Sequence, residues 1–305
     1  MRELKFTVPQ ENDGVLLRNF LRGTCRISAR LSAKLKRTEN GVTRNGILIK
    51  SRDVLFAGEV VVIKIDDDTA VPSKFSCPLD IVFEDEDVIA VNKPHGMVVH
   101  PTKHYSGNTL SNAVAYHMSE RGEYAAFRPV NRLDRDTSGL VVAGKNIYSA
   151  SRLSGSVSKT YLAVCEGELS GSGTIDTPIA REEGHSSKRK VSPEGDRSVT
   201  HWTVLCSLGG MTLLEIRLET GRTHQIRVHF SSIGMPLCGD DLYGGGRELI
   251  GRQALHCREA EFVHPVSGEI ISLSAPVPND MAALPPCRRY AEEMEKGEKC
   301  SSSEM

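Results

Sequence analysis

A polar loop with alternating charges is the segment of this sequence whose residue types best suit chemistry. It reads Asn131-Arg-Leu-Asp-Arg-Asp-Thr-Ser-Gly-Leu140 and leads into the apolar run Leu140-Val-Val-Ala-Gly144. The pattern predicts that the carboxylate of Asp134 lies beside a buried strand, with Thr137 and Ser138 available to hydrogen-bond the loop backbone. A carboxylate held in this way can act as a nucleophile or as a base.

Two other interpretations of this loop stay open on spacing alone. In the first, Arg132 and Arg135 neutralise Asp134 and Asp136, and the loop has only a structural role. In the second, Asp134 and Asp136 form the carboxylate pair of a glycoside hydrolase. The second is disfavoured because residues two apart in one loop seldom face the same ligand, and each of these carboxylates is flanked by arginine.

A buried carboxylate that must stay ionised needs a cation nearby, because burial alone favours its protonated form. The run Leu213-Leu-Glu-Ile-Arg-Leu-Glu219 predicts a strand that ends at Thr220 and Gly221. A helix is expected from Arg222 onward, with His224 and Arg227 three residues apart on one face. Arg227 is the natural partner for Asp134.

Several motifs, taken together, resemble one family. The sequence R-L-D-x-x-T-S-G in the loop is very similar to the catalytic motif of the RluA family of pseudouridine synthases. Four further stretches resemble that family's other signatures and occur in the family's order within residues 83–276, namely Asn92–Pro101, Lys159–Ala163, Thr220–His229 with Gly234–Asp240, and Ala254–His256.

The resemblance implies an isomerase that converts uridine to pseudouridine in RNA, and it implies site residues. Asp134 corresponds to the catalytic aspartate, Tyr161 to the aromatic residue packed against the target uracil, and Arg227 to the arginine paired with the aspartate. Arg132 corresponds to the residue that enters the RNA stack as the base leaves it. One departure from the family pattern is Asn131, where many members have histidine.

The reaction so implied needs no cofactor. A glycosidic carbon–nitrogen bond breaks, the uracil turns and rejoins the sugar through a ring carbon, and nothing is oxidised or transferred to another molecule. We also expect no metal, because the histidines and cysteines lack the usual zinc spacings. No phosphate-binding glycine loop is present, which argues against a nucleotide cofactor. The alternative from another class is a ribosome-assembly or RNA-binding factor that only binds, which would tolerate Asp134→Asn.

The first 65 residues carry 13 Lys and Arg against 6 Asp and Glu, although the whole chain has a net charge of −1. Apolar spacing predicts two short helices at Val15–Leu21 and Ser28–Arg37, followed by an Asn45-Gly46 hairpin turn and a strand at Val60–Ile65. The region resembles the small RNA-binding domain named after ribosomal small-subunit protein four. Its second helix is expected to present a basic stripe that contacts RNA phosphates, made of Arg26, Arg30, Lys34 and Arg37.

The order of strand and helix patterns predicts an α+β fold, with a mixed, mainly antiparallel sheet and flanking helices in the catalytic part. We expect a basic RNA-binding domain at 1–66, a linker at 67–80, a catalytic domain at 81–290 and a disordered tail at 291–305. Strands are predicted at 81–83, 88–93, 140–143, 159–165, 200–205, 211–218 and 270–273, and helices at 109–120, 149–154 and after Gly221.

Composition favours a cytoplasmic protein. The eight cysteines are scattered and form no C-x-x-C pair, and no apolar run reaches the roughly 18 residues that a spanning helix requires. We therefore expect no membrane association, a reducing compartment and a monomer. The expected partner is a structured RNA with an exposed uridine. Ribosomal large-subunit RNA is the substrate class that the resemblance implies most often, and transfer RNA is the alternative.

Overall fold

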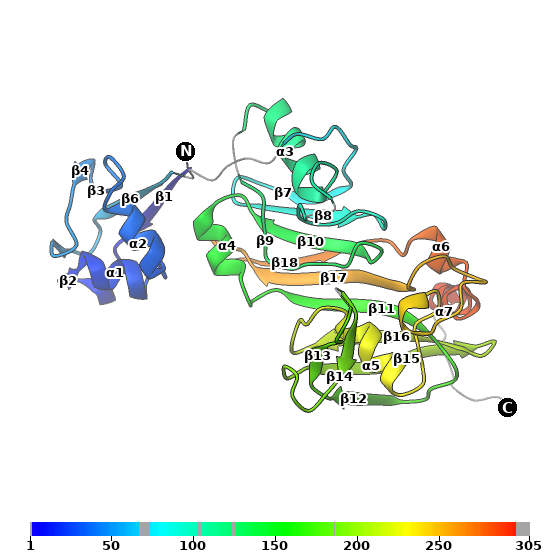
Figure 1. Cartoon of the computed structure of the whole chain (residues 1–305). Coiled ribbons are helices and arrows are strands. Elements are labelled where there is room, and N and C mark those ends of the chain that lie inside the picture. Colours follow the sequence, from blue (N-terminus) through cyan, green and yellow to red (C-terminus); the bar gives the residue numbers. More distant parts are fainter. Residues whose placement is uncertain (1, 67–72, 103–104, 124–125, 186, 297–305) are drawn as a thin grey trace.

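The structure is a computed structural model that describes residues 2–66, 73–102, 105–123, 126–185 and 187–296. A small N-terminal part is followed by a larger part built on a broad sheet, and the predicted α+β class is confirmed (Figure 1). In the described part of the chain, no helix is long and apolar enough to cross a membrane.

The N-terminal part, called the basic module below, is two short helices packed on small sheets. Its four-stranded sheet has the order β1-β6-β3-β4, and a separate pair joins β2 to β5. The elements are β1 Arg2–Thr7, a 3-10 turn Gln10–Asn12, β2 Val15–Leu16, α1 Leu17–Gly23, α2 Ala29–Leu35, β3 Val42–Arg44, β4 Ile47–Leu48, β5 Val54–Leu55 and β6 Val60–Ile65.

Turn and cap chemistry explains where these elements begin and end. Asn45 and Gly46 both have positive φ, as a tight hairpin requires, so the predicted turn is confirmed. The Ser28 hydroxyl accepts a hydrogen bond from the Leu31 amide and caps α2. The first predicted helix is corrected at its start, because Val15 and its neighbour pair with β5 before the helix begins.

The expected basic stripe also changes. Arg26 lies before α2 in the left-handed backbone region, with φ of 51°, so it is not on the helix. Arg37 follows the helix end. Arg30, Lys34 and Arg37 together line a groove of about 910 Å³ beside Lys64 on β6. The cationic surface therefore comes from the start of the loop after α2 as well as from α2 itself.

The larger part is built on a ten-stranded, mainly antiparallel sheet with the order β12-β15-β16-β11-β17-β10-β8-β7. The other two of the ten strands lie off this order: β9 pairs with β10, and β18 pairs with β17. The β10–β17 pair is parallel. The strands are β7 Ile81–Glu84, β8 Val88–Lys93, β9 Arg128–Pro129, β10 Ser138–Gly144, β11 Ser158–Glu166, β12 Ser172–Asp176, β15 Val199–Leu208, β16 Met211–Leu218, β17 Leu255–Val263 and β18 Ile270–Ser274.

Helices cover this sheet, and a two-stranded ribbon of β13 and β14 stands beside it (Figure 1). Every strand predicted for this part is present. The remaining elements are α3 Leu110–Glu120, α4 Ile147–Leu153, β13 Ile179–Arg181, β14 Arg189–Val191, α5 Gln225–Ser232, a 3-10 turn Asp241–Tyr243, α6 Asn279–Ala282 and α7 Pro285–Lys296. The main core lies between α3, α4, α5 and the central strands. Because β10 is buried along its whole length, it gives the site a rigid base.

Two of the predicted segments, the linker and the tail, can be compared with the structure. Within the predicted linker, residues 67–72 lie outside the described residues, while Ser73 and Phe75 are hydrogen-bonded to Asn112 on α3. The predicted tail is corrected, because α7 continues to Lys296 instead of ending at 290, and residues 297–305 lie outside the described part. The helix packs on β15 and β16 through Cys287 and Tyr290, and beyond them Glu293 is buried and pairs with Arg289.

The basic module contacts the larger part through α4 and the start of β8. Arg2 donates two hydrogen bonds to the buried carboxylate of Asp87, at 3.1 and 2.7 Å. The ring of Tyr148 on α4 packs edge-on against Phe6 and its hydroxyl donates to the Cys25 carbonyl. Tyr148 thus belongs to the hydrophobic core of the module.

Candidate active site

The loop that bears Asp134 joins β9 to β10, and its backbone is fixed from within. Asn131 is buried; its side-chain amide donates to the Leu140 carbonyl at 3.0 Å and its oxygen accepts from the Val142 amide at 2.9 Å. The residue that departs from the family pattern therefore joins the loop to β10. Gly139 follows the loop with φ of 110°, and a Cβ there would lie 2.2 Å from the Cys257 carbonyl, so only glycine lets β10 approach β17.

Two buried basic side chains hold the same loop from outside. The Lys93 amino group lies within hydrogen-bond distance of three backbone carbonyls, those of Pro94, Met97 and Arg135, at 2.8, 2.8 and 3.0 Å. The guanidinium of Arg252 donates to the Asp136 carbonyl at 3.1 Å. These contacts leave the loop little freedom on either side of Asp134.

Burial of Lys93 gives a testable dependence of stability on pH. Desolvation lowers the pKa of Lys93 from 10.5 to about 7, so between these values the unfolded chain binds a proton that the native chain lacks. The free energy of unfolding should therefore rise with pH across this window, by up to about 1.4 kcal/mol per unit from this residue. Lys93→Met should lose that contribution in urea unfolding measured from pH 7 to 9.

The exposed Lys74 provides the matched control for this measurement, since Lys74→Met should keep the wild-type slope. Parallel slopes for Lys93→Met and the wild type would show that Lys93 stays charged in the native chain throughout this range.

Asp134 lies opposite a buried ion pair. Arg227 on α5 donates from Nη1 to Asp134 Oδ2 at 3.0 Å, and from Nε and Nη2 to the two oxygens of Asp240, both at 2.7 Å. The side chain of Asp134 is 25% exposed, while those of Arg227 and Asp240 are 7% and 0% exposed. The carboxylate predicted to do chemistry is thus the one that a substrate can reach.

The start of α5 differs from the prediction. The helix begins at Gln225 instead of Arg222, because His224 adopts the left-handed conformation with φ of 58°. The Gln225 side chain accepts hydrogen bonds from the Thr220 hydroxyl and the Arg222 amide and fixes this turn. His224 therefore does not share a helical face with Arg227.

His224 nevertheless reaches the site from the turn before the helix. Its Nε2 lies 3.8 Å from Asp134 Oδ2, and its Nδ1 lies 2.8 Å from the Tyr243 hydroxyl. Burial lowers the pKa of His224, although the nearby Asp134 acts in the opposite direction. The neutral imidazole is therefore favoured beside the carboxylate.

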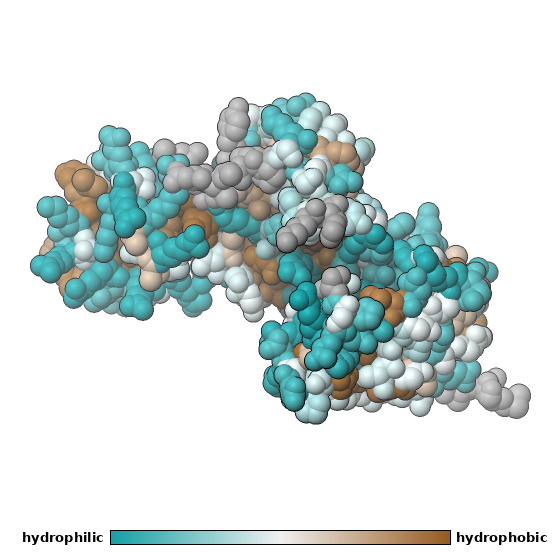
Figure 2. Space-filling model, viewed as in Figure 1, coloured by the Kyte–Doolittle hydropathy of each residue, from teal (hydrophilic) through white to brown (hydrophobic). Residues whose placement is uncertain are grey.

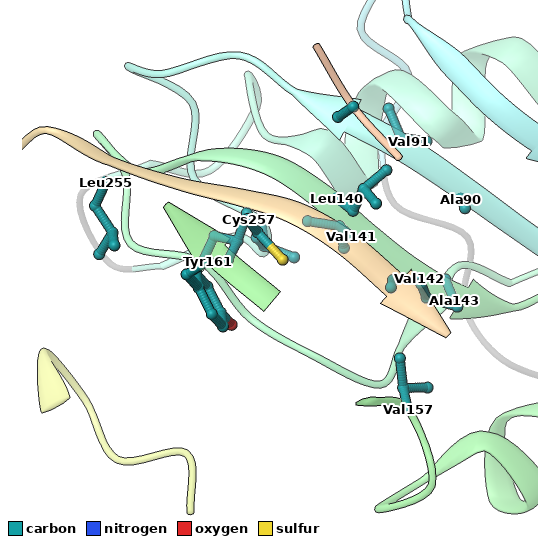
Figure 3. Packing of buried hydrophobic residues seen from close by; sticks show 14 of the residues in the cluster. Ala90, Val91, Leu140, Val141, Val142, Ala143, Val157, Tyr161, Leu255 and Cys257 are labelled. Carbon is teal, nitrogen blue, oxygen red and sulfur yellow. The ribbon is translucent and has the colours of Figure 1, made fainter. Parts of the chain in front are cut away.

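Tyr161 stands on β11 between β16 and β17, and is only 6% exposed. Figure 3 shows its ring beside Cys257 of the neighbouring strand, with Leu255 further along β17. Burial raises the pKa of Tyr161 well above its usual value, so the phenol stays neutral. The ring offers an apolar, uncharged surface next to Asp134.

The predicted site residues meet in one place. Arg132, Asp134, Tyr161 and Arg227 all line a recess of about 80 Å³, which His224 also borders. The recess adjoins an open cleft of about 1010 Å³ that shares the first three of these residues. Five further cationic or imidazole side chains line that cleft: His100, Lys159, Arg181, Arg189 and Arg222. Four carboxylates line it as well, those of Asp134, Glu194, Asp196 and Glu219, so the cleft is wide and strongly polar and carries charges of both signs.

The ion-paired loop proposed as the structural interpretation exists in part. Arg135 binds its neighbour Asp136 through Nε and Nη2, with the shortest distance 2.7 Å, and also donates to the Tyr105 hydroxyl. Asp134, in contrast, is paired with Arg227 from a distant element. Among the residues that the structure describes, no group of three or more His, Cys, Asp or Glu is arranged to hold a metal ion.

Sequence reasoning left several functional neighbours without a role. Asp240 ends one of the motifs quoted above, yet nothing in its spacing indicates that it binds Arg227. Tyr243, whose ring centre lies 5.0 Å from the guanidinium carbon of Arg227, is also unmarked by pattern. Lys93 lies in a quoted motif, and its three carbonyl contacts depend on a turn that only the fold reveals.

Comparison with known proteins places these observations in a family. Residues 87–232 match the family described as RNA pseudouridylate synthase. The chain is 46% identical over 220 residues to the uncharacterized RNA pseudouridine synthase YhcT of Bacillus subtilis, covering 70% of this chain and 72% of the relative. It is 38% identical over 270 residues to ribosomal large subunit pseudouridine synthase D of Vibrio cholerae, covering 81% and 82%.

A solved structure shows the same fold. Human RNA pseudouridylate synthase domain containing 1 superimposes with a TM-score of 0.56 at 23% identity, covering 77% of this chain and all of that one. The sequence identities to the bacterial enzymes, over most of both chains, carry the assignment. This chain belongs to the RNA pseudouridine synthases, a family of isomerases.

Proposed function

We propose that this enzyme converts specific uridines of ribosomal large-subunit RNA to pseudouridine, with Asp134 as its essential carboxylate. The observation that carries the proposal is the accessible Asp134 paired with buried Arg227 and adjacent to Tyr161, at the recess of a wide polar cleft. The relative from Vibrio cholerae is named for the large ribosomal subunit, which favours that RNA over transfer RNA.

The geometry suits each step of the reaction. Asp134 supplies the carboxylate that acts on the base or sugar when the glycosidic bond breaks, and Arg227 stabilises its ionised form. Before that step the uridine must leave its stack, at a cost of a few kcal/mol. Tyr161 provides a flat apolar face for the uracil, and the exposed Arg132 at the cleft mouth fills the space the base leaves.

The basic module supplies affinity in this proposal. Arg30, Lys34 and Arg37 border one groove and contact phosphates there, and Arg26 adds charge at the loop before α2. Phosphate contacts add binding energy without selecting sequence, and they weaken as salt rises. The enzyme acts as a monomer in the cytoplasm, where the ribosomal RNA is assembled.

Removing two of these charges gives a measurable effect on RNA binding. Arg30→Gln with Arg37→Gln should remove two phosphate contacts and flatten the slope of log affinity against log salt by about 1.4 to 1.8. Arg18→Gln with Arg22→Gln on α1 is the matched control, because both residues are exposed and lie away from the groove. An equal loss of slope in both double variants would assign the binding to overall charge.

Pseudouridine mapping in cells tests the proposed function. Ribosomal and transfer RNA are prepared from cells with the gene intact, deleted or carrying Asp134→Asn, then derivatised and mapped by reverse transcription. We expect the same large-subunit sites to disappear in both altered strains. Loss of transfer RNA sites would change the substrate, and loss in the deletion strain alone would indicate a protein that acts by binding.

A further inference from the structure

The guanidinium of Arg227 is shared unequally between two carboxylates. Asp240 receives two hydrogen bonds of 2.7 Å, in the planar, two-point arrangement that makes arginine–carboxylate pairs strong. Asp134 receives one, at 3.0 Å, and only on Oδ2. Arg227 is thus oriented by Asp240 and gives Asp134 a single N–H group.

The surroundings of Asp240 exclude any direct part in RNA binding. Its side chain is fully buried, and it lines neither the cleft nor the recess. A buried carboxylate is strongly destabilising unless a cation pairs with it, so Asp240 needs a positively charged partner. That partner is the arginine of the proposed site.

We propose that Asp240 is a positioning residue that prevents Arg227 from pairing fully with Asp134. This inference rests on the proposed function of Asp134. Two carboxylates compete for one guanidinium, and the geometry favours the buried one. Asp134 consequently has a guanidinium partner on Oδ2 and keeps Oδ1 available for the uridine, whereas a two-point pair with Arg227 would engage both of its oxygens.

Other groups that face Asp134 contribute to its charge balance. They come from four elements: His224 before α5, Tyr243 of the 3-10 turn, Tyr161 of β11 and Lys93 of β8. Both tyrosines stay neutral because burial raises their pKa values, that of Tyr243 to about 12. Replacing Asp240 leaves these groups in place. A change in the titration of the Asp134 carboxyl therefore reports on how Arg227 is paired.

The direct test is Asp240→Asn, followed by carbon-13 NMR titration of the Asp134 carboxyl, whose signal is assigned by its loss in Asp134→Asn. Without its buried carboxylate, Arg227 should turn to Asp134 and favour its ionised form. The titration midpoint of Asp134 should then fall below the wild-type value. In multiple-turnover assays kcat should fall about 10²-fold because the reactive oxygen is engaged, while the RNA Kd stays within twofold.

Asp241→Asn is the matched control, since this adjacent carboxylate is 63% exposed and pairs with Arg247 at the surface. It should leave the Asp134 midpoint and kcat unchanged. An unchanged or higher Asp134 midpoint in Asp240→Asn would overturn the inference. A fall in kcat matched by an equal loss of RNA affinity would do the same.

A second measurement covers the case in which Asp240→Asn does not fold. Nitrogen-15 spectra of the Arg227 guanidinium, assigned with Arg227→Lys, are recorded for the wild type and for Asp134→Asn. Slow rotation and distinct Nη signals should persist in Asp134→Asn if Asp240 orients the arginine. Their loss would show that Asp134 does so. Neither NMR measurement requires turnover, so failure of the proposed function is seen separately, as absent product from the wild-type enzyme.

Discussion

Asp134→Asn is expected to lower the rate of pseudouridine formation by at least about 10⁴-fold, because asparagine can act neither as a nucleophile nor as a base. The fold should persist, since Arg227 keeps both of its hydrogen bonds to Asp240 and Asp134 is partly exposed. RNA affinity should change little for the same reason. Rates are measured by single turnover on a large-subunit RNA fragment, and folding by thermal unfolding.

The loop itself offers the control for this variant. Asp136→Asn removes a carboxylate two residues away that pairs with Arg135 and does not line the cleft or the recess. We expect its rate to stay within about threefold of the wild type, in line with the small effects of most surface changes. Equal losses in the two variants would mean that loop structure, and not the Asp134 carboxylate, limits the reaction.

Arg227→Met should have the largest combined effect on stability and activity. It leaves the fully buried Asp240 without a cation, which should lower the free energy of unfolding by about 3–5 kcal/mol. Asp134 loses its only guanidinium hydrogen bond among the described residues and is protonated more easily. The rate should fall about 10²- to 10³-fold, and the acid limb of the kcat/KM profile should move to higher pH.

Urea unfolding and pH–rate profiles check both parts of this expectation. Arg217→Met is a suitable control, because Arg217 is 65% exposed on β16 and pairs with Glu215 at the surface. Its stability should change by no more than about 0.5 kcal/mol. A fully active, stable Arg227→Met enzyme would remove the ion pair from the account.

Much of the site follows from local sequence, and the reasons are physical. The apolar run after Ser138 predicts a buried strand, and that strand is β10, which places Asp134 at its start. The strands of the catalytic part are recognisable because each side chain pattern matches a half-buried or buried sheet position. Motif order then predicts that Asp134, Tyr161 and Arg227 meet, and the structure brings them to one recess.

The remainder depends on contacts between distant segments. The helix of Arg227 starts later than its pattern predicts because His224 takes a left-handed conformation, fixed by side-chain hydrogen bonds of Gln225. The contact of Lys93 with the Arg135 carbonyl joins residues 42 positions apart in the sequence, and that of Arg252 with the Asp136 carbonyl joins residues 116 positions apart. No periodicity carries such information.

The surface of the molecule is mostly hydrophilic on the face shown in Figure 2. Figure 2 shows hydrophilic residues over most of the visible face of both parts, with hydrophobic residues scattered among them. The side chains of Lys93 and Arg252 hold the loop of Asp134 in place before RNA arrives, so little reorganisation is needed at the reaction step.

Release of hydrogen from uracil C5 tests the central claim most directly. Joining the sugar to C5 displaces the hydrogen there, so RNA labelled with tritium at uridine C5 should release it to water as pseudouridine forms. We predict stoichiometric release from large-subunit RNA with the full-length enzyme and with Asp136→Asn, and none above background with Asp134→Asn. Release by Asp134→Asn at the wild-type rate would contradict the account, as would a wild-type enzyme that releases no tritium from ribosomal or transfer RNA.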